Sequence, residues 1–209
     1  RPGGMLFSDY EKAQIAESVA ILTVALALAL AGGLGAALAN LSIFAVKLLM
    51  SFAAVMTGFL LHELAHKWMA QKYGCWAEYR GNRNGLLLAL LMGAFGFLIA
   101  APGAVMVAGH VTPRQHGHIA AVGPLTNIAL ALAALPFYLL LAGAAGPLGW
   151  AGALARFLVI INIILGGFNM IPVPPLDGSK IMAWSSAAWG GIVAGILALA
   201  MVYWTIPPF

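Results

Sequence analysis

The sequence predicts an all-α membrane protein, a bundle of about five transmembrane helices with a non-spanning re-entrant or β-hairpin region near residues 86–110. The first observation is composition: 63% of the 209 residues are hydrophobic and only 8% are charged, whereas about a quarter of the residues in a soluble domain are charged. The second is run length, because several apolar runs reach the roughly 20 residues that a helix needs to cross a bilayer. The third is that most basic residues fall near the ends of these runs, where they act as topology signals.

Five apolar runs are expected to span the membrane, at about residues 19–39, 41–73, 119–142, 151–170 and 187–206. The second is expected to continue as one helix from its apolar part into a more polar end. Residues 171–180 are rich in proline and cannot form a regular helix, because each proline removes a backbone donor. No room remains for a sizeable soluble domain, so we expect one membrane-embedded domain covering residues 1–209.

The region that should not cross the membrane begins with a short apolar run at residues 86–101. This run is shorter than a spanning helix requires. Residues 103–109 are rich in valine, are flanked by glycines and read as a possible strand. The sequence therefore predicts a re-entrant loop, a hairpin or a strand pair here.

Charge and cysteine content exclude several other classes of protein. The net charge of +4 is small, so we expect no nucleic-acid partner. Cys75 is the only cysteine, so no disulfide can form within the chain. Residues 1–14 lack the short apolar core and cleavage site of a removable signal peptide, and we expect none.

A metal-binding pattern lies at the polar end of the second span, where residues 58–66 read Gly-Phe-Leu-Leu-His-Glu-Leu-Ala-His. His62 and His66 are four residues apart, on one helix face, and can bind one zinc ion. Glu63 lies on the adjoining face, where it can take a proton from a metal-bound water. The alternative is a polar helix end at the membrane interface, although ionisable residues after a long apolar run are expensive and usually functional.

A catalytic zinc ion normally has three protein ligands and one open position. Asp177 is the only acidic residue after Glu78, and it ends the proline-rich segment. Irregular backbone at membrane depth persists only where it is buried in protein or lines a wet cavity. Asp177 is therefore the preferred third ligand, with a helix-capping aspartate in an ordinary loop as the alternative. The other candidate ligands are Cys75, His110, His116 and His118.

Topology tests the pairing of these two distant motifs. His62 lies about twenty residues into the second span and Asp177 follows a similar length of the fourth. Both reach the same depth only if these two helices run parallel, with residues 119–142 as the single crossing between them. One side of the membrane then carries Arg1, Lys12, Lys67, Lys72, Arg80, Arg83, Arg114 and Lys180. The other side carries Lys47 and Arg156, so we expect the N-terminus and the mouth of the site on the cytoplasmic face.

Three motifs in this order resemble the site-2 protease family of intramembrane zinc metalloproteases, in a short form without PDZ or CBS domains. They read Phe-Leu-Leu-His-Glu-Leu-Ala-His at residues 59–66, Gly-Pro-Leu-Thr-Asn at 123–127 and Pro-Leu-Asp-Gly at 175–178. The resemblance places the catalytic core at about residues 41–180. It implies one Zn²⁺ per chain held by His62, His66 and Asp177, with Glu63 as the general base. It also makes Asn169 a catalytic candidate that helps bind substrate or stabilise the oxyanion.

The function that this resemblance implies is zinc-dependent endopeptidase cleavage of transmembrane segments, as in regulated intramembrane proteolysis. The expected partners are a transmembrane protein substrate and the lipid bilayer, and the oligomeric state stays open. Residues 103–109 could hold an unwound substrate by strand addition. For Asn169 the alternative is an interhelical hydrogen bond, and we expect structural roles for Asn127 and Asn162. A membrane transporter or channel that uses the His/Glu cluster, and an inactive scaffold with structural zinc, are the rival functions.

Overall fold

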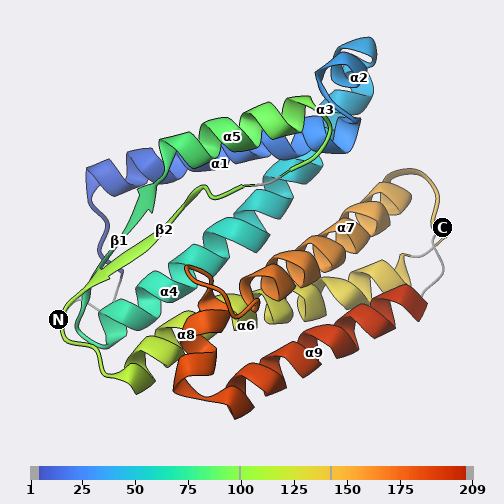
Figure 1. The fold of residues 1–209 in the computed structure, drawn as a ribbon. Helices are drawn as coiled ribbons and strands as arrows, with labels where there is room; N and C mark the ends of the chain where they lie inside the picture. Colours follow the sequence, from blue (N-terminus) through green and yellow to red (C-terminus); the bar gives the residue numbers. More distant parts are fainter. Residues whose placement is uncertain (1–4, 99, 142, 206–209) are drawn as a thin grey trace. The chain divides into compact units, whose positions relative to one another are not determined.

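The computed structural model describes residues 5–98, 100–141 and 143–205. The chain divides into two compact units, one made of Arg1–Met56 and Trp76–Ala108 and the other of Thr57–Cys75 and Gly109–Phe209. Each unit is predominantly helical (Figure 1). The single membrane-embedded domain expected from the sequence stays a prediction.

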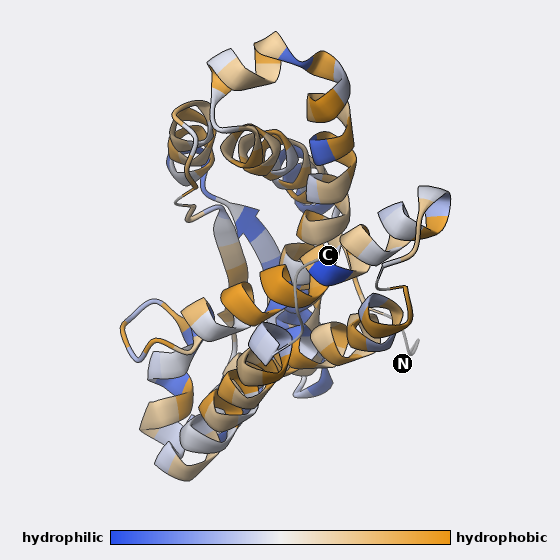
Figure 2. Cartoon of the chain, turned by 90° about the vertical axis from the view of Figure 1, so that its right-hand side faces the viewer, coloured by the Kyte–Doolittle hydropathy of each residue, from blue (hydrophilic) through white to orange (hydrophobic). Residues whose placement is uncertain are grey.

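Five helical segments in the described residues are long and apolar enough to cross a membrane: Asp9–Ala31, Leu41–Lys72, Pro113–Leu140, Gly146–Asn169 and Ser186–Thr205. They confirm the predicted all-α membrane bundle. Hydrophobic residues run along most of these helices (Figure 2). Large apolar side chains are left uncovered by protein, including Leu49 at 72%, Leu140 at 81% and Trp204 at 74% exposure. Surfaces of this kind suit contact with lipid.

The first span begins and ends earlier than the sequence suggested. Helix α1, Asp9–Ala31, is capped by Ser8, whose hydroxyl accepts a hydrogen bond from the Glu11 backbone N–H. It stops at Gly32, which has a left-handed backbone with φ of 88°. The prediction of 19–39 was wrong at both ends because a polar first turn can be helical when it is capped, and because glycine readily adopts the turn that ends a helix. Leu34–Ala39 forms the separate short helix α2.

The first unit also contains α3, Leu41–Ala54, and the short helix α5, Arg83–Ala94. At 12 residues α5 is too short to cross a bilayer, which agrees with the predicted non-spanning region. It packs closely on α1, since a Cβ atom at Gly93 would lie 2.3 Å from the Ala25 carbonyl oxygen.

An antiparallel strand pair completes this unit. Strand β2, Gly103–Ala108, confirms the predicted strand, and it pairs with β1, Trp76–Gly81, in a register that runs from Trp76↔Ala108 to Gly81↔Gly103. The sequence did not predict β1 because its residues are polar. Its outer edge is satisfied by α1: the backbone N–H groups of Tyr79 and Gly81 donate to the side chains of Glu11 and Gln14, each at 2.8 Å.

The second unit is built around α6, Pro113–Leu140. Around it pack α4 (Leu61–Lys72), α7 (Gly146–Asn169), α8 (Asp177–Trp184) and α9 (Ser186–Thr205). The six-residue π-helix Val55–Leu60 joins α3 to α4. The core between α6, α7, α8 and α9 includes Tyr138, Val159, Ile163 and Ile181.

The directions of the helices confirm the pairing expected from topology. On α4 and α6, His62 contacts Asn127 and His66 contacts Ile119, so these two helices are antiparallel. On α6 and α7, Asn127 contacts Asn162 and Tyr138 faces Arg156, so these two are antiparallel as well. Therefore α4 and α7 run parallel, with α6 as the crossing between them.

Candidate metal centre

Helix α4 places two histidines beside one another in the interior of the second unit. The side chains of His62 and His66 stand one turn apart on the face of α4 that packs against α6, and both residues are buried. The π-helix Val55–Leu60 directly precedes them. Single π-helical turns inside α-helices are frequent at functional sites.

Asp177 reaches these histidines from a different part of the chain. Helix α7 ends at Asn169, and α8 begins at Asp177 itself. The irregular segment therefore ends at residue 176 and not at 180 as expected, because no proline follows Pro175 before the next helical turn. The segment is held in place where the Trp189 indole N–H donates to the Met170 carbonyl at 2.8 Å.

Close backbone packing at the start of α8 requires glycine after the aspartate. A Cβ atom at Gly178 would lie 2.2 Å from the Met170 carbonyl oxygen and 2.7 Å from that of Ile171. No side chain fits at such distances. Packing therefore explains the glycine that follows Asp177: it lets the turn fold back on itself, so that the Asp177 carboxylate points inward.

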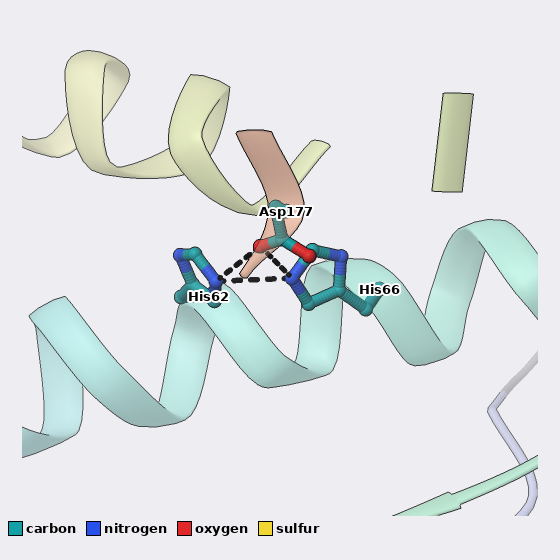
Figure 3. A group of neighbouring side chains, drawn as sticks. All are labelled: His62, His66 and Asp177. Atoms are coloured by element: carbon teal, nitrogen blue, oxygen red, sulfur yellow. Dashed lines mark hydrogen bonds and ion pairs between the residues drawn. The ribbon is translucent and has the colours of Figure 1, made fainter. Parts of the chain in front are cut away.

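The three side chains converge on one point (Figure 3). The Nε2 atoms of His62 and His66 are 3.0 Å apart, and the Asp177 Oδ2 atom lies 3.2 Å from the first and 3.0 Å from the second. Among the described residues, these three form the group of histidine, cysteine and acidic side chains that could hold a metal ion. Cys75, His110, His116 and His118 are not part of it.

Each imidazole makes a hydrogen bond through Nδ1, on the side away from this point. That bond determines which ring nitrogen carries the proton. His66 Nδ1 lies 2.6 Å from the carbonyl oxygen of Ile119, and His62 Nδ1 lies 2.7 Å from the Asn127 side-chain oxygen. Both oxygens only accept, so each Nδ1 carries the proton and each Nε2 presents a lone pair. With both imidazoles neutral, their two Nε2 atoms and the Asp177 carboxylate present three lone-pair donors to one point, an arrangement that fits a cation.

This donor set fits zinc. Two imidazole nitrogens and one carboxylate oxygen are common protein ligands of catalytic zinc, and tetrahedral bonds of about 2.0–2.1 Å place the donor atoms roughly 3.3 Å apart. The observed separations of 3.0–3.2 Å are close to that spacing. Metal-bound histidines also characteristically donate their other ring N–H to a carbonyl or carboxylate, as both do here.

Helix α6 contributes a glycine that sequence reasoning did not assign to the site. A Cβ atom at Gly123 would lie 2.4 Å from His66 Nε2 and 2.6 Å from His62 Cε1. The backbone of α6 therefore forms one wall of the centre. The Gly-Pro-Leu-Thr-Asn motif was the available signal, because it contributes both this glycine and Asn127.

Further polar side chains surround the three converging residues. Lys180 Nζ lies 3.2 Å from Asp177 Oδ1, whereas His62 and His66 contact the other oxygen of this carboxylate, Oδ2. Glu63 follows His62 directly and is half-buried. Asn169 lies in the last turn of α7, where its amide donates to the Leu165 carbonyl at 3.0 Å. The roles of Glu63 and Asn169 stay predictions.

His118, one of the three histidines just before the predicted third span, has other partners. His118 Nδ1 lies 2.6 Å from the Tyr73 hydroxyl, and its ring meets that of Trp184 edge-on at 4.7 Å between centroids. These contacts link the end of α4 to α6 and α8, and His118 is not part of the group that could hold a metal ion.

Comparison with known proteins gives several similar chains. The chain is 40% identical over 161 residues to "Putative zinc metalloprotease MJ0611" of Methanocaldococcus jannaschii, covering 75% of this chain and 82% of that one. It is 30% identical over 145 residues to "Putative zinc metalloprotease YwhC" of Bacillus subtilis, covering 61% and 65%. It is 30% identical over 128 residues to "Putative zinc metalloprotease Rip3" of Mycobacterium tuberculosis, covering 61% and 28%. No family model matches the sequence, and no solved structure matches it.

Proposed function

Because the chain belongs to a family of zinc metalloproteases and has Zn²⁺ as its cofactor, we propose that it is an intramembrane endopeptidase of the site-2 protease type. Its substrates are transmembrane segments of other membrane proteins. The observation that carries this proposal is the convergence of three potential ligand atoms, 3.0–3.2 Å apart, within a bundle of apolar helices.

In this proposal His62, His66 and Asp177 hold the ion, and Glu63 acts as the general base. When bound, zinc polarises the scissile carbonyl and lowers the pKa of a coordinated water towards about 7. The Glu63 carboxylate takes the proton from the attacking water and passes it to the departing amine nitrogen. The Asn169 Nδ2 uses one N–H to donate to the Leu165 carbonyl at 3.0 Å, and its second N–H would donate to the oxyanion.

A transmembrane substrate must be unwound and held in an extended conformation before cleavage. A helical substrate hides its peptide bonds in its own hydrogen bonds, so it must unwind locally before attack. Strand β2 is the element that we propose to hold the unwound segment by strand addition. The outer edge of its partner β1 is already occupied by the side chains of Glu11 and Gln14.

The same proposal includes an orientation in the membrane. In the second unit, basic residues lie on the same helices as the metal centre, with Lys67 and Lys72 on α4 and Lys180 on α8. Arg156 lies towards the other end of α7. From the positive-inside rule, we propose that the N-terminus and the mouth of the site face the cytoplasm.

The first experiment measures zinc content of the detergent-purified wild type and of Asp177→Ala. We expect about one zinc ion per wild-type chain and clear loss in the variant, because removal of one ligand opens the site. Full retention of zinc in the variant would place the third ligand elsewhere and would refute the proposed site.

The second experiment separates a protease from a scaffold or a transporter. Glu63→Gln keeps the three zinc ligands but removes the base, so we expect normal zinc content with cleavage of a single-span substrate reduced by a factor of about 10²–10⁴. Undiminished cleavage by this variant would refute the role of Glu63. A wild type that binds zinc but cleaves no membrane substrate would favour a scaffold.

A further inference from the structure

Two buried asparagines lie behind the metal centre, Asn127 on α6 and Asn162 on α7. Their exposed fractions are 0% and 1%, so their hydrogen bonds cannot be exchanged for water. The proposal that follows rests on the proposed function, because it concerns how His62 is presented to zinc.

The hydrogen-bond partners decide which way each amide points. The Leu158 carbonyl only accepts, so the Asn162 Nδ2 donates to it at 2.9 Å and leaves the Asn162 Oδ1 as an acceptor. The Asn127 Nδ2 donates to this oxygen and to the Gly58 carbonyl, both at 2.9 Å. The Asn127 Oδ1 is thereby turned towards His62 Nδ1, 2.7 Å away.

We infer that Asn127, oriented by Asn162, is a positioning residue that keeps the proton of His62 on Nδ1 and its Nε2 lone pair directed at the metal. If the Asn127 amide turned over, its Nδ2 would face Nδ1 and would require an acceptor there. His62 would then carry its proton on Nε2 and could not bind the ion. Three helices thus cooperate to select one tautomer of one ligand.

The test is the zinc affinity of detergent-purified protein, measured by competition with a chelator. Asn127→Leu removes the acceptor, and we expect affinity to fall about 10- to 100-fold, the usual effect of losing such an outer partner. Asn127→Asp keeps an acceptor for Nδ1 and should retain most of the affinity. Thr126→Val is the matched control, because the Thr126 hydroxyl donates to the Val122 carbonyl of its own helix.

A purely structural role predicts a different pattern. It would lower the thermal stability of the zinc-free protein in both Asn127 variants and would weaken zinc binding equally in both, which would overturn the inference. Unchanged affinity in Asn127→Leu would overturn it as well. A wild type that binds no zinc would refute the proposed function instead. Should Asn127→Leu fail to fold, Asn162→Leu serves, because it removes one of the two acceptors that orient the Asn127 amide and should weaken zinc binding several-fold.

A second inference rests on an independent observation, a cavity of about 630 Å³ at the other end of α6. It lies between the last turns of α6 and α9 and the first half of α7. Its lining includes one charged residue, Arg156, with Tyr138, Trp150 and Tyr203 around it.

Arg156 has no acidic partner there. Its Nε donates to the Tyr203 hydroxyl at 3.2 Å, and its guanidinium lies 6.0 Å from the Tyr138 ring and 5.8 Å from the Tyr203 ring. The acidic side chains of the second unit are Glu63 and Asp177, on α4 and α8. Within the described residues the two terminal nitrogens therefore have no hydrogen-bond acceptor and are available to a ligand at the cavity.

The depth of this cavity suits a lipid head group. Arg156 is level with the last turns of α6 and α9, since Tyr138 and Tyr203 contact it and these helices end at Leu140 and Thr205. Tryptophan and tyrosine gather at membrane interfaces, and a guanidinium fork matches phosphate oxygens. We propose that this cavity binds the phosphodiester head group of an anionic phospholipid.

Native mass spectrometry of the full chain in detergent tests this site with phosphatidylglycerol, with diacylglycerol of the same acyl chains and with inorganic phosphate. We expect one phosphatidylglycerol per chain, bound at least about tenfold more weakly by Arg156→Gln. Lys47→Gln is the matched control, because the Lys47 ammonium already donates to the Leu30 carbonyl at 2.8 Å. Equal binding of diacylglycerol, equal competition by inorganic phosphate, or unchanged binding by Arg156→Gln would each overturn the proposal.

Discussion

Replacing Gly123 by alanine offers a sharp test of how α6 shapes the metal centre. The added Cβ would lie 2.4 Å from His66 Nε2, 2.5 Å from His66 Cε1 and 2.6 Å from His62 Cε1. Ordinary contact begins near 3.4 Å, so either the helix or the imidazoles must move by about 1 Å. The imidazoles cannot easily turn aside, because each is also bonded through Nδ1 to α6.

The expected size of the effect follows from the tolerance of metal sites. Metal–ligand distances vary by about 0.2 Å, so a displacement near 1 Å should remove at least one ligand. We expect zinc affinity to fall by two orders of magnitude or more and cleavage to fall at least about 100-fold. The substitution should nevertheless favour the helix itself, because alanine is better than glycine in a helix interior by roughly 0.8–1.0 kcal/mol.

A matched control isolates the contact from the change in helix propensity. Gly195→Ala on α9 makes the same substitution, and its Cβ would meet only Ile128 Cδ1 at 3.8 Å. The assay is chelator competition for zinc, with thermal unfolding of the zinc-free protein beside it. If Gly123→Ala bound zinc as tightly as Gly195→Ala, the conclusion that the α6 backbone packs directly against the zinc-binding imidazoles would be wrong.

Further predictions concern the surroundings of Asp177 and the expected behaviour of the holoprotein. Gly178→Ala, whose Cβ would meet the Met170 carbonyl oxygen at 2.2 Å, should shift the carboxylate and reduce zinc content, measured by metal analysis. Lys180→Met, which removes the ammonium 3.2 Å from Asp177 Oδ1, should weaken zinc binding several-fold by chelator competition. Acidification should release zinc, because the imidazoles must be neutral and the carboxylate ionised to bind it; retention of metal at pH 4 by folded protein would contradict the ligand set. Val107→Pro should impair cleavage more than zinc content, and equal loss of both would count against substrate binding by β2.

Much of the fold followed from hydrophobic run length. The spans were predictable because lipid offers no hydrogen-bond partners to the backbone. A helix can span it because its backbone N–H and C=O groups bond to one another within the same segment. The two histidines followed from their four-residue spacing. Asp177 followed from the scarcity of acidic residues, since only one carboxylate after Glu78 was available.

The features that escaped prediction depend on contacts between distant segments. Strand β1 is polar, and its edge is completed by Glu11 and Gln14 more than sixty residues earlier in the chain. Asn127 and Asn162 were expected to be structural, yet Asn127 bonds a histidine of the metal centre directly. Gly123 has no side chain that could suggest a role. It matters because the imidazoles of His62 and His66 leave no space for a Cβ atom at this position.

The face of α6 that meets the metal centre presents three positions four residues apart, and each contributes through a different kind of atom. Ile119 accepts a hydrogen bond through its main-chain carbonyl, and Asn127 accepts one through its side-chain amide oxygen. Gly123 leaves the space that the two imidazoles occupy. Mutational tolerance should differ accordingly along this one face. Any apolar helix former should serve at position 119, glycine alone at 123, and only side chains with a suitably placed acceptor at 127. A saturation library scored for activity should therefore show a permissive position at 119, an intolerant one at 123 and a chemically selective one at 127. All three lie against the imidazoles of the metal centre, Ile119 at His66, Asn127 at His62 and Gly123 at both.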